Sequence, residues 1–462
     1  MLKKFTSACI KIANNYLPNP FLFALLLTGI IFCMGIFLNN QTPLEMVNHW
    51  GGGLWNYLGF SMQMVLAVVL GNCLANTELF DKVLSKLAGI PKTPKQAVAF
   101  ASLVAGIACL IQWSFGLVIG AVFAKKIAKT VKGVDYRLLI AASYSVYILT
   151  VLTSTIPLKA ASNPNEIVVV TAGVLKDVVP MSLTAYNPVT LITCLIMLIT
   201  IPLLNAAMHP DPDKTVCIDA SLLDEDTKYV APDRSKMTPA EKIENSRIIT
   251  LLIVALSVVY IGNIIHKTGF NLTIDLMNLI LFTLGMLLHK TPIAFVNAVM
   301  NAIKSATGIV IQFPFYAGIM GIMTGVNADG VSLAKILSDG IVSFATPGTF
   351  PLFSFISAAL VNMFVPSAGG QWGVQAPAMF PAAQALGVRP ELTVMSLCWG
   401  DNWTNLIQPF WALPALGIAK LGVRDIMGYL VVIFLWTGII LFSMFMIWGY
   451  LLVSVSYTHL TL

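Results

Sequence analysis

Stretches of about 20 apolar residues, each long enough to cross a bilayer as a helix, follow one another along almost the whole chain. Of the 462 residues, 57% are hydrophobic and only 10% are charged, whereas soluble domains carry roughly 25% charged residues. We therefore predict an all-α polytopic membrane protein, in contact with the lipid bilayer. The predicted spans are Phe21–Leu38, Phe60–Leu74, Leu138–Ile156, Val189–Ala206, Ile248–Ile265, Leu276–Leu288, Gly308–Thr324, Leu392–Leu413 and Tyr429–Leu451.

The charged residues lie mainly between these spans. The formal net charge is +6, and in a membrane protein such an excess reports topology, not nucleic-acid binding. Residues 1–20 form a basic lead-in that we expect on the cytoplasmic side, and residues 207–247 form a charged cytoplasmic linker. Residues 452–462 are expected as a tail beyond the last span, and a cloning scar is the alternative for its end.

One apolar segment, residues 97–123, has lysines on both sides. Lys92 and Lys95 precede it, and Lys125 and Lys126 follow it. Lys and Arg favour the cytoplasmic side of a membrane, so both ends should lie there. This pattern favours a re-entrant hairpin that turns at Gln112-Trp113-Ser114, although an ordinary span that departs from the charge rule is the alternative. Non-helical backbone at such depth requires cover by protein or a water-filled cavity.

The two halves of the sequence contain ordered matches that indicate an internal repeat. Thr42-Pro43 recurs as Thr291-Pro292, Gln112-Trp113 as Gln371-Trp372, and Gly133-Val134 as Gly387-Val388. The repeat predicts a second hairpin over residues 350–386, where the Pro- and Gly-rich run 365–372 interrupts an apolar stretch.

Counting crossings gives the predicted organisation. Residues 21–206 form the first transmembrane repeat, residues 248–265 a connecting helix, and residues 271–451 the second repeat. The connecting helix makes the repeats inverted, with one hairpin reaching in from each side. Inverted repeats underlie alternating access, with the substrate site near the midplane.

Two predicted spans carry polar residues just before a proline. One continues as Leu152-Thr153-Ser154-Thr155-Ile156-Pro157, and the other as Asp401-Asn402-Trp403-Thr404-Asn405-Leu406-Ile407-Gln408-Pro409. Proline breaks the hydrogen-bond ladder of a helix, so Pro157 and Pro409 predict discontinuous transmembrane helices. The freed N–H groups and helix ends can hold an anion.

We therefore expect a substrate site between the hairpins and the broken spans, whose cores contain no Arg or Lys. This favours a small monovalent anion over a multiply charged one. The alternative is that the same polar residues form hydrogen bonds that hold neighbouring helices together. The predicted substrate-binding residues are Gln112, Trp113, Thr153, Ser154, Thr155, Ser367, Gly369, Gly370, Gln371, Trp372, Asn402 and Asn405.

Asp401 is the only acidic residue of its span. A carboxylate inside a membrane is costly and usually marks a proton relay or an ion site, so we predict that Asp401 binds the coupling ion. The alternative is an ionised aspartate that caps the helix break.

Other classes of protein fit less well. The chain has no HExxH, no GxSxG and no His–carboxylate cluster at depth, so we expect no enzyme, no cofactor and no metal site. A channel would differ by lacking gradient-driven accumulation.

Several long motifs resemble the short-chain fatty acid transporter family. They are the runs 366–372 (PSAGGQW), 381–387 (PAAQALG), 408–416 (QPFWALPAL), 421–429 (LGVRDIMGY) and 312–319 (QFPFYAGI), with Trp113-x-x-Gly116-Leu117-Val118-x-Gly120-Ala121. The resemblance covers the chain to about residue 450. Residues 144–157, glycine-rich in that family, are largely β-branched here, which implies a narrower pocket.

The resemblance places the chain among ion-coupled carboxylate transporters with paired hairpins. It implies a symporter that imports acetoacetate, butyrate and similar monocarboxylates with a proton or sodium ion. It also implies a location in the bacterial inner membrane with the N-terminus in the cytoplasm. A carrier of another small anion, such as a dicarboxylate, is the alternative. Families of this architecture often form homodimers, so a homodimer is one option.

Overall fold

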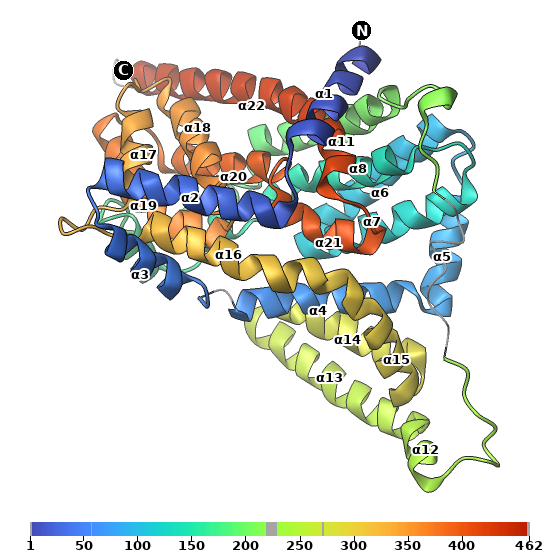
Figure 1. Cartoon of the computed structure of the whole chain (residues 1–462). Helices are drawn as coiled ribbons and strands as arrows, with labels where there is room; N and C mark the ends of the chain where they lie inside the picture. The colour runs from blue at the N-terminus through green and yellow to red at the C-terminus, as the bar shows by residue number, and fades with distance from the viewer. Residues whose placement is uncertain (1, 57, 219–228, 270–271, 460–462) are drawn as a thin grey trace.

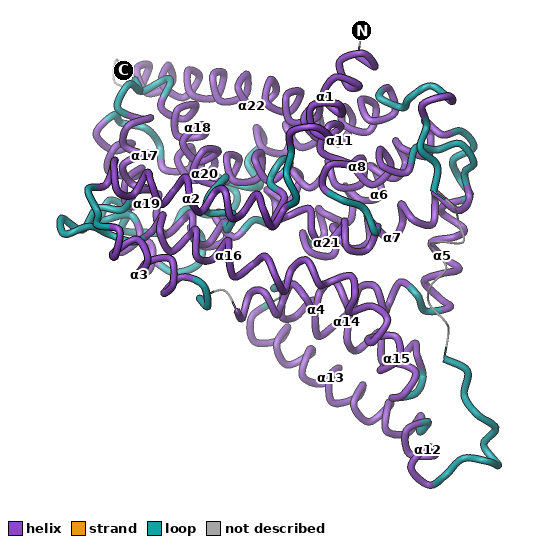
Figure 2. Tube along the Cα trace, viewed as in Figure 1, coloured by secondary structure: helices purple, strands orange, loops and turns teal. Residues whose placement is uncertain are grey.

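The computed structural model describes residues 2–56, 58–218, 229–269 and 272–459. Over these residues the chain forms helices, and the only strand-like pairing is an isolated bridge between Val326 and Ser332 (Figure 2). This confirms the predicted all-α fold. Eight helical segments of the described chain have the length and apolar composition to cross a membrane: 20–39, 58–75, 94–111, 136–160, 188–207, 239–267, 292–324 and 423–450.

The helices of the first half follow the order α1 (Leu2–Tyr16), α2 (Pro20–Asn39), α3 (Pro43–Gly53), α4 (Leu58–Ala75), α5 (Glu78–Ala88), α6 (Pro94–Ile111), α7 (Trp113–Thr130), α8 (Tyr136–Ser145), the 3-10 helix η1 (Val146–Thr153), α9 (Thr155–Ala160), α10 (Pro164–Val170) and α11 (Pro188–Ala207). The linker contains η2 (Pro212–Lys214) and α12 (Pro239–Glu244). Part of the predicted linker, residues 219–228, lies outside the described residues.

The second half contains α13 (Arg247–Thr268), α14 (Ile274–His289), α15 (Pro292–Ala302), η4 (Ile303–Ala306), α16 (Thr307–Thr324), α17 (Leu333–Val342), α18 (Phe350–Asn362), α19 (Ala368–Ala385), α20 (Pro390–Asn405), α21 (Pro409–Ala419) and α22 (Val423–His459). In Figure 1, α13 runs along the edge of the bundle beside α14. The helix α22 continues past residue 451, where we had predicted the last span to end and a tail to begin.

Helix starts explain the repeated Thr-Pro pairs. Thr42 caps α3 and Thr291 caps α15, and in both helices proline is the first residue. A threonine oxygen can accept the free N–H groups of a first turn, and proline has no N–H to leave unpaired there. The same two-residue signal therefore starts the same helix in each half.

Helices of the two halves contact one another in exchanged pairs. The helix α2 packs against α16, and α14, which holds the corresponding place in the second half, packs against α4. Likewise α7 packs against α21 while α19 packs against α9. A two-fold pseudosymmetry between the halves would generate this reciprocity.

The helices α6 and α7 form an antiparallel hairpin, called hairpin one here. A Cβ on Gly116 would lie 2.7 Å from the Cα of Cys109, and one on Gly120 would lie 3.0 Å from the Cβ of Ala105. Both glycines lie on α7 and both neighbours lie on α6. Because the glycines have no Cβ, the two helices can pack close together. Gln112 caps α7 by accepting a hydrogen bond from the Phe115 N–H at 2.8 Å.

The helices α18 and α19 form the matching hairpin two. The Gln371 amide donates to the Ala358 carbonyl at 2.8 Å, and Gln375 donates to Ser357 at 3.2 Å. Ser367 caps α19 by accepting from the Gly370 N–H. The turn therefore lies at residues 363–367, and Gln371-Trp372 falls one helical turn inside α19. Gln112 and Ser367 therefore cap the second helix of their hairpins, whereas the sequence repeat pairs Gln112 with Gln371.

Hydrogen bonds among buried polar groups connect the loop before α8 to the start of the linker, and we call this cluster the polar joint. The Asp135 N–H donates to His209 Nε2 at 3.1 Å, and the Asp135 carboxylate accepts from the Val216 N–H at 2.9 Å. His209 Nδ1 lies 2.9 Å from the Pro210 carbonyl. A neutral His209 ring satisfies both contacts, whereas a protonated ring would set an N–H against the Asp135 N–H.

We expect this joint to make the protein less stable in acid. Burial lowers the pKa of His209 below its ordinary value of 6.5. The unfolded chain then binds more protons than the folded one, so stability falls as the pH drops below about 6.5. The melting temperature in detergent measured against pH tests this. His209→Gln, which keeps an acceptor but does not titrate, should flatten part of the decline. His266→Gln, at an exposed histidine, is the control and should not change the decline. If the melting temperature depends on pH equally in the wild type and in His209→Gln, the expectation is wrong.

Candidate functional site

Two helices are broken where the polar residues lie. In the first half, α8 tightens into η1, which ends before Ser154, and Ser154 caps the short helix α9. Pro157 lies inside α9, so the break comes three residues earlier than predicted. In the second half, α20 ends at Asn405 and Pro409 starts α21, as predicted. Proline is tolerated in both places because first-turn N–H groups have no helical partner.

The broken helices and both hairpins meet around one cavity of about 70 Å³, called the central cavity here. Space of roughly 10–15 Å³ holds one water molecule, so the cavity has room for about five groups of that size. Its lining combines polar and aromatic side chains: Phe60, Trp113, Tyr147, Thr150, Ser154, Thr155, Ser367, Ala368, Gly369, Asp401, Asn402, Asn405 and Trp411.

Hydrogen bonds fix the polar wall of the central cavity. The Thr150 hydroxyl donates to Asn402 Oδ1 at 2.6 Å, which joins the two broken helices. Asn362 of hairpin two donates to the Asp401 carbonyl at 2.8 Å and lies 2.7 Å from Asn405 Oδ1. The wall is therefore built from three elements that cannot shift independently without breaking these bonds.

Asp401 is 3% exposed and faces this cavity. Its Oδ2 accepts a long hydrogen bond of 3.3 Å from the Asn405 amide, and its Oδ1 has no hydrogen-bond partner among the described residues. A buried carboxylate oxygen without a donor is costly. A proton or a bound cation would remove that cost.

The structure brings seven of the twelve predicted binding residues to the central cavity, and these are Trp113, Ser154, Thr155, Ser367, Gly369, Asn402 and Asn405. Gln112 and Gly370 take part in the hairpin caps. Thr153 donates back to the Thr150 carbonyl. Gln371 and Trp372 lie in the core of hairpin two, where Trp372 packs edge-on against Phe380.

Four aromatic residues line the central cavity, and we call them its aromatic wall: Phe60, Trp113, Tyr147 and Trp411. Of these, only Trp113 was predicted from the sequence. Trp411 stands at the centre of this wall, with Trp113, Tyr147 and Phe60 at ring-centroid distances of 5.4, 5.7 and 6.2 Å. Aromatic residues in membrane spans usually indicate interfacial anchors, and no local signal separates these from anchors. The run 408–416, which the family resemblance singled out, does contain Trp411.

Lys159, which the sequence analysis did not consider, adds a cation beside the site. A Cβ on Gly369 would lie 3.8 Å from Lys159 Nζ and 3.8 Å from Thr155 Cγ2. Lys159 has no acidic partner among the described residues. The hairpin-two side of the central cavity thus has an ammonium group beside it, contrary to the expected cation-free site.

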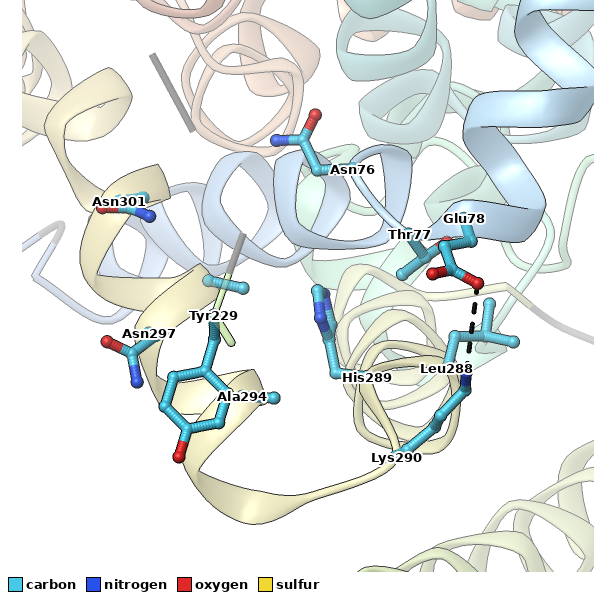
Figure 3. Close-up of a pocket in the computed structure, with 11 residues that line it drawn as sticks. Asn76, Thr77, Glu78, Tyr229, Leu288, His289, Lys290, Ala294, Asn297 and Asn301 are labelled. Carbon is cyan, nitrogen blue, oxygen red and sulfur yellow. Dashed lines mark ion pairs between the residues drawn. The ribbon is translucent and has the colours of Figure 1, made fainter. Parts of the chain in front are cut away.

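A larger cavity of about 230 Å³ lies elsewhere, among the loop between α4 and α5, the start of α5, the end of α14, α15 and Tyr229 of the linker. Figure 3 shows His289 and Tyr229 pointing into it, and the ion pair between Glu78 and Lys290 at 3.9 Å beside it. It contains no residue of either hairpin or broken helix. We therefore place the candidate site at the smaller central cavity.

The fold and this cavity define a multi-spanning helical membrane protein with a small polar site where two hairpins meet two broken helices. Residues 1–448 match the model of the family described as "Short chain fatty acid transporter", and the chain belongs to that family. It is therefore a transporter, not an enzyme.

Curated relatives agree with this assignment. A protein of Haemophilus influenzae is 40% identical over 442 residues, covering 95% of this chain and 98% of its own. A protein of Escherichia coli is 39% identical with the same coverage. Both are named, provisionally, as short-chain fatty acid transporters.

Two solved structures are also similar to this chain. The YdaH transporter of Alcanivorax borkumensis has a TM-score of 0.46 and 16% identity, covering 95% of this chain and 99% of its own. MtrF of Neisseria gonorrhoeae, from a class of antimetabolite efflux pumps, has a TM-score of 0.36 and 13% identity, covering 96% and 97%. At these values neither likeness carries an argument about function.

Proposed function

We propose that the chain is a secondary active transporter that imports short-chain monocarboxylates together with a coupling cation by alternating access. The observation that carries the proposal is the central cavity, because both hairpin tips and both broken helices contribute to its lining. Its volume suits a small acid. Its polar wall offers hydroxyl and amide groups to a carboxylate, and its aromatic wall offers apolar surface to a short chain.

Asp401 is the proposed coupling residue. Asp401 lines the same space as the polar wall, and its Oδ1 has no hydrogen-bond partner among the described residues. A cation bound at this carboxylate would offset the charge of a neighbouring substrate carboxylate. Substrate and cation would then favour each other's binding, which is the requirement for coupled transport.

The exchanged contacts between the two halves support the inverted repeat. With the N-terminus in the cytoplasm of a bacterium and the chain in its inner membrane, hairpin one would reach in from the cytoplasm and hairpin two from outside. The lysines flanking hairpin one favour this orientation. Alternating access would then exchange the roles of the two hairpins.

Uptake into proteoliposomes tests the proposal. A proton gradient and a sodium gradient are imposed in separate experiments. The purified full chain should accumulate labelled butyrate or acetoacetate under one of them and should not accumulate it without a gradient. Saturable accumulation under one gradient would identify the coupling ion. Failure to transport any acid of two to six carbons would refute the proposal, and equilibration without accumulation would indicate a channel.

Lys159 favours a second candidate, a carrier of dicarboxylates, because an ammonium group beside Gly369 could bind a further carboxylate. Succinate as a competitor of butyrate uptake decides between the two. A dicarboxylate that competes more strongly than butyrate itself would favour the second candidate.

We expect Lys159→Gln to raise the KM for a monocarboxylate about fivefold, the equivalent of about 1 kcal/mol for a half-screened ion pair. The maximal rate should change little, because Lys159 lies beside the site and not within its polar wall. Lys159→Arg should keep most of the affinity. Lys176→Gln, at an exposed lysine of the loop that follows α10, is the matched control. An unchanged KM in Lys159→Gln would exclude this role.

A further inference from the structure

A second, smaller space adjoins the central cavity, and its walls are almost wholly apolar. It has a volume of about 10 Å³ and shares Phe60 and Ser367 with the central cavity. Its other walls include Phe313, Tyr316 and Met320 of α16. We call this space the aromatic recess.

The walls of the recess are held by ring packing. Phe313 stacks on Phe410 with ring centroids 3.9 Å apart, and Tyr316 meets Phe410 edge-on at 5.1 Å. All three side chains are at most 5% exposed. Such interlocked rings give way only at considerable cost, so the recess keeps its size.

The sizes of the two spaces suit the two ends of a short acid. At roughly 10–15 Å³ for each water-sized group, the recess takes about one methyl-sized group. The polar cavity takes about five, which leaves room for a carboxylate and the first few carbons. A longer chain would have to displace Phe313, Phe410 or Met320.

We propose that the aromatic recess is the subsite for the acyl tail and that its depth sets the longest acid the protein accepts. This rests on the proposed function, since it assumes a carboxylate in the central cavity. Met320 and Ala317, both on α16, set the depth. Met320 is flexible and half-buried, and Ala317 is the smallest wall residue on that helix.

One wall residue of the recess, Tyr316, carries a polar group without a partner among the described residues. The Tyr316 hydroxyl is buried and makes no hydrogen bond within the described residues. A tail with a carbonyl or hydroxyl near its end could accept or share that hydrogen bond, whereas a plain alkyl tail would leave the hydroxyl unsatisfied. The recess should therefore favour 3-oxo and 3-hydroxy acids over the plain acid of equal length, and Tyr316→Phe should remove the preference.

Binding of a series of acids from two to eight carbons tests the proposal, measured by isothermal titration calorimetry on the full chain in detergent. Met320→Ala should strengthen the binding of the five- and six-carbon acids relative to butyrate, by about fourfold for each added methylene. Ala317→Val should weaken butyrate relative to acetate. Met323→Ala removes the same atoms from a buried site of the same helix outside the recess, and should leave the chain-length profile unchanged.

The outcomes separate the two claims. A wild-type protein that binds short acids but does not transport them would refute the proposed function and leave the recess assigned as a tail subsite if the variants shift as expected. Chain-length profiles in Met320→Ala and Ala317→Val that equal the wild-type profile would overturn the recess. So would an equal shift in Met323→Ala, or a wild-type protein that binds none of the acids.

Discussion

Replacing Asp401 by asparagine should slow the gradient-driven uptake of a short-chain acid by roughly ten- to a hundredfold. Asparagine has the same size and keeps an oxygen that can accept from Asn405, but it can neither carry a proton nor attract a cation. Loss of a charge-assisted contact worth about 1.5–3 kcal/mol corresponds to a rate reduced by roughly ten- to a hundredfold. Uptake into proteoliposomes, with exchange of internal for external substrate measured beside it, gives the readout.

Exchange without a gradient should survive in Asp401→Asn, because the polar and aromatic walls of the cavity remain. Asp177→Asn, at an exposed loop position, controls for the loss of one negative charge. If Asp401→Asn accumulates substrate as well as the wild type does, coupling must reside in other residues.

Adding a single methyl group at Gly116 should destabilise the protein strongly. In Gly116→Ala the new Cβ would lie 2.4 Å from Cys109 Sγ and 2.7 Å from both the Cα and the N of that residue. A clash with backbone cannot be relieved by turning a side chain, so the two helices of hairpin one must part. Overpacking of this kind costs about 3 kcal/mol. The melting temperature in detergent and the yield of monodisperse protein measure the loss.

Two further variants sharpen this test. Gly373→Ala, in hairpin two, has open space around the new Cβ and should leave stability unchanged. Adding Cys109→Ala to Gly116→Ala should not restore stability, because the backbone contacts remain. Full recovery in the double variant would mean that only the sulfur was in the way.

Much of the architecture could be predicted because the length of an apolar stretch and the capping residues at its ends indicate where a membrane helix begins and ends. Lysines on both sides of residues 97–123 favoured a hairpin, and the structure turns at Gln112; that both ends lie on one side of the membrane stays a prediction. The second turn was placed less closely, because the predicted break at residues 365–372 overlaps only part of the observed turn at residues 363–367, and Gln371 falls one helical turn inside α19. A repeat found from a few identical residues fixes the order of helices more reliably than their register.

The site was only partly predictable, and the missing part depends on packing between distant segments. Lys159 lies in α9, the short second part of a broken helix, and nothing nearby in the sequence indicates that it lies beside Gly369. Trp411 and Tyr147 look like ordinary span aromatics until the fold packs Trp411 edge-on against Trp113 and places Tyr147 against Trp411. Asp401, by contrast, could be found from sequence, because an acidic residue in an apolar span is rare for energetic reasons.

The tight contact at Gly116 also determines which way a solute can leave. Since the two helices of hairpin one touch at backbone level, no carboxylic acid can pass between them. A solute that travels from the central cavity toward the base of that hairpin must go around it. The route we propose is the seam between α7 and α21, where the indoles of Trp113 and Trp411 meet edge-on. On that route the hairpin would have to tilt as one piece to part the two rings. Compounds that wedge into this seam should therefore block traffic in both directions without occupying the site itself.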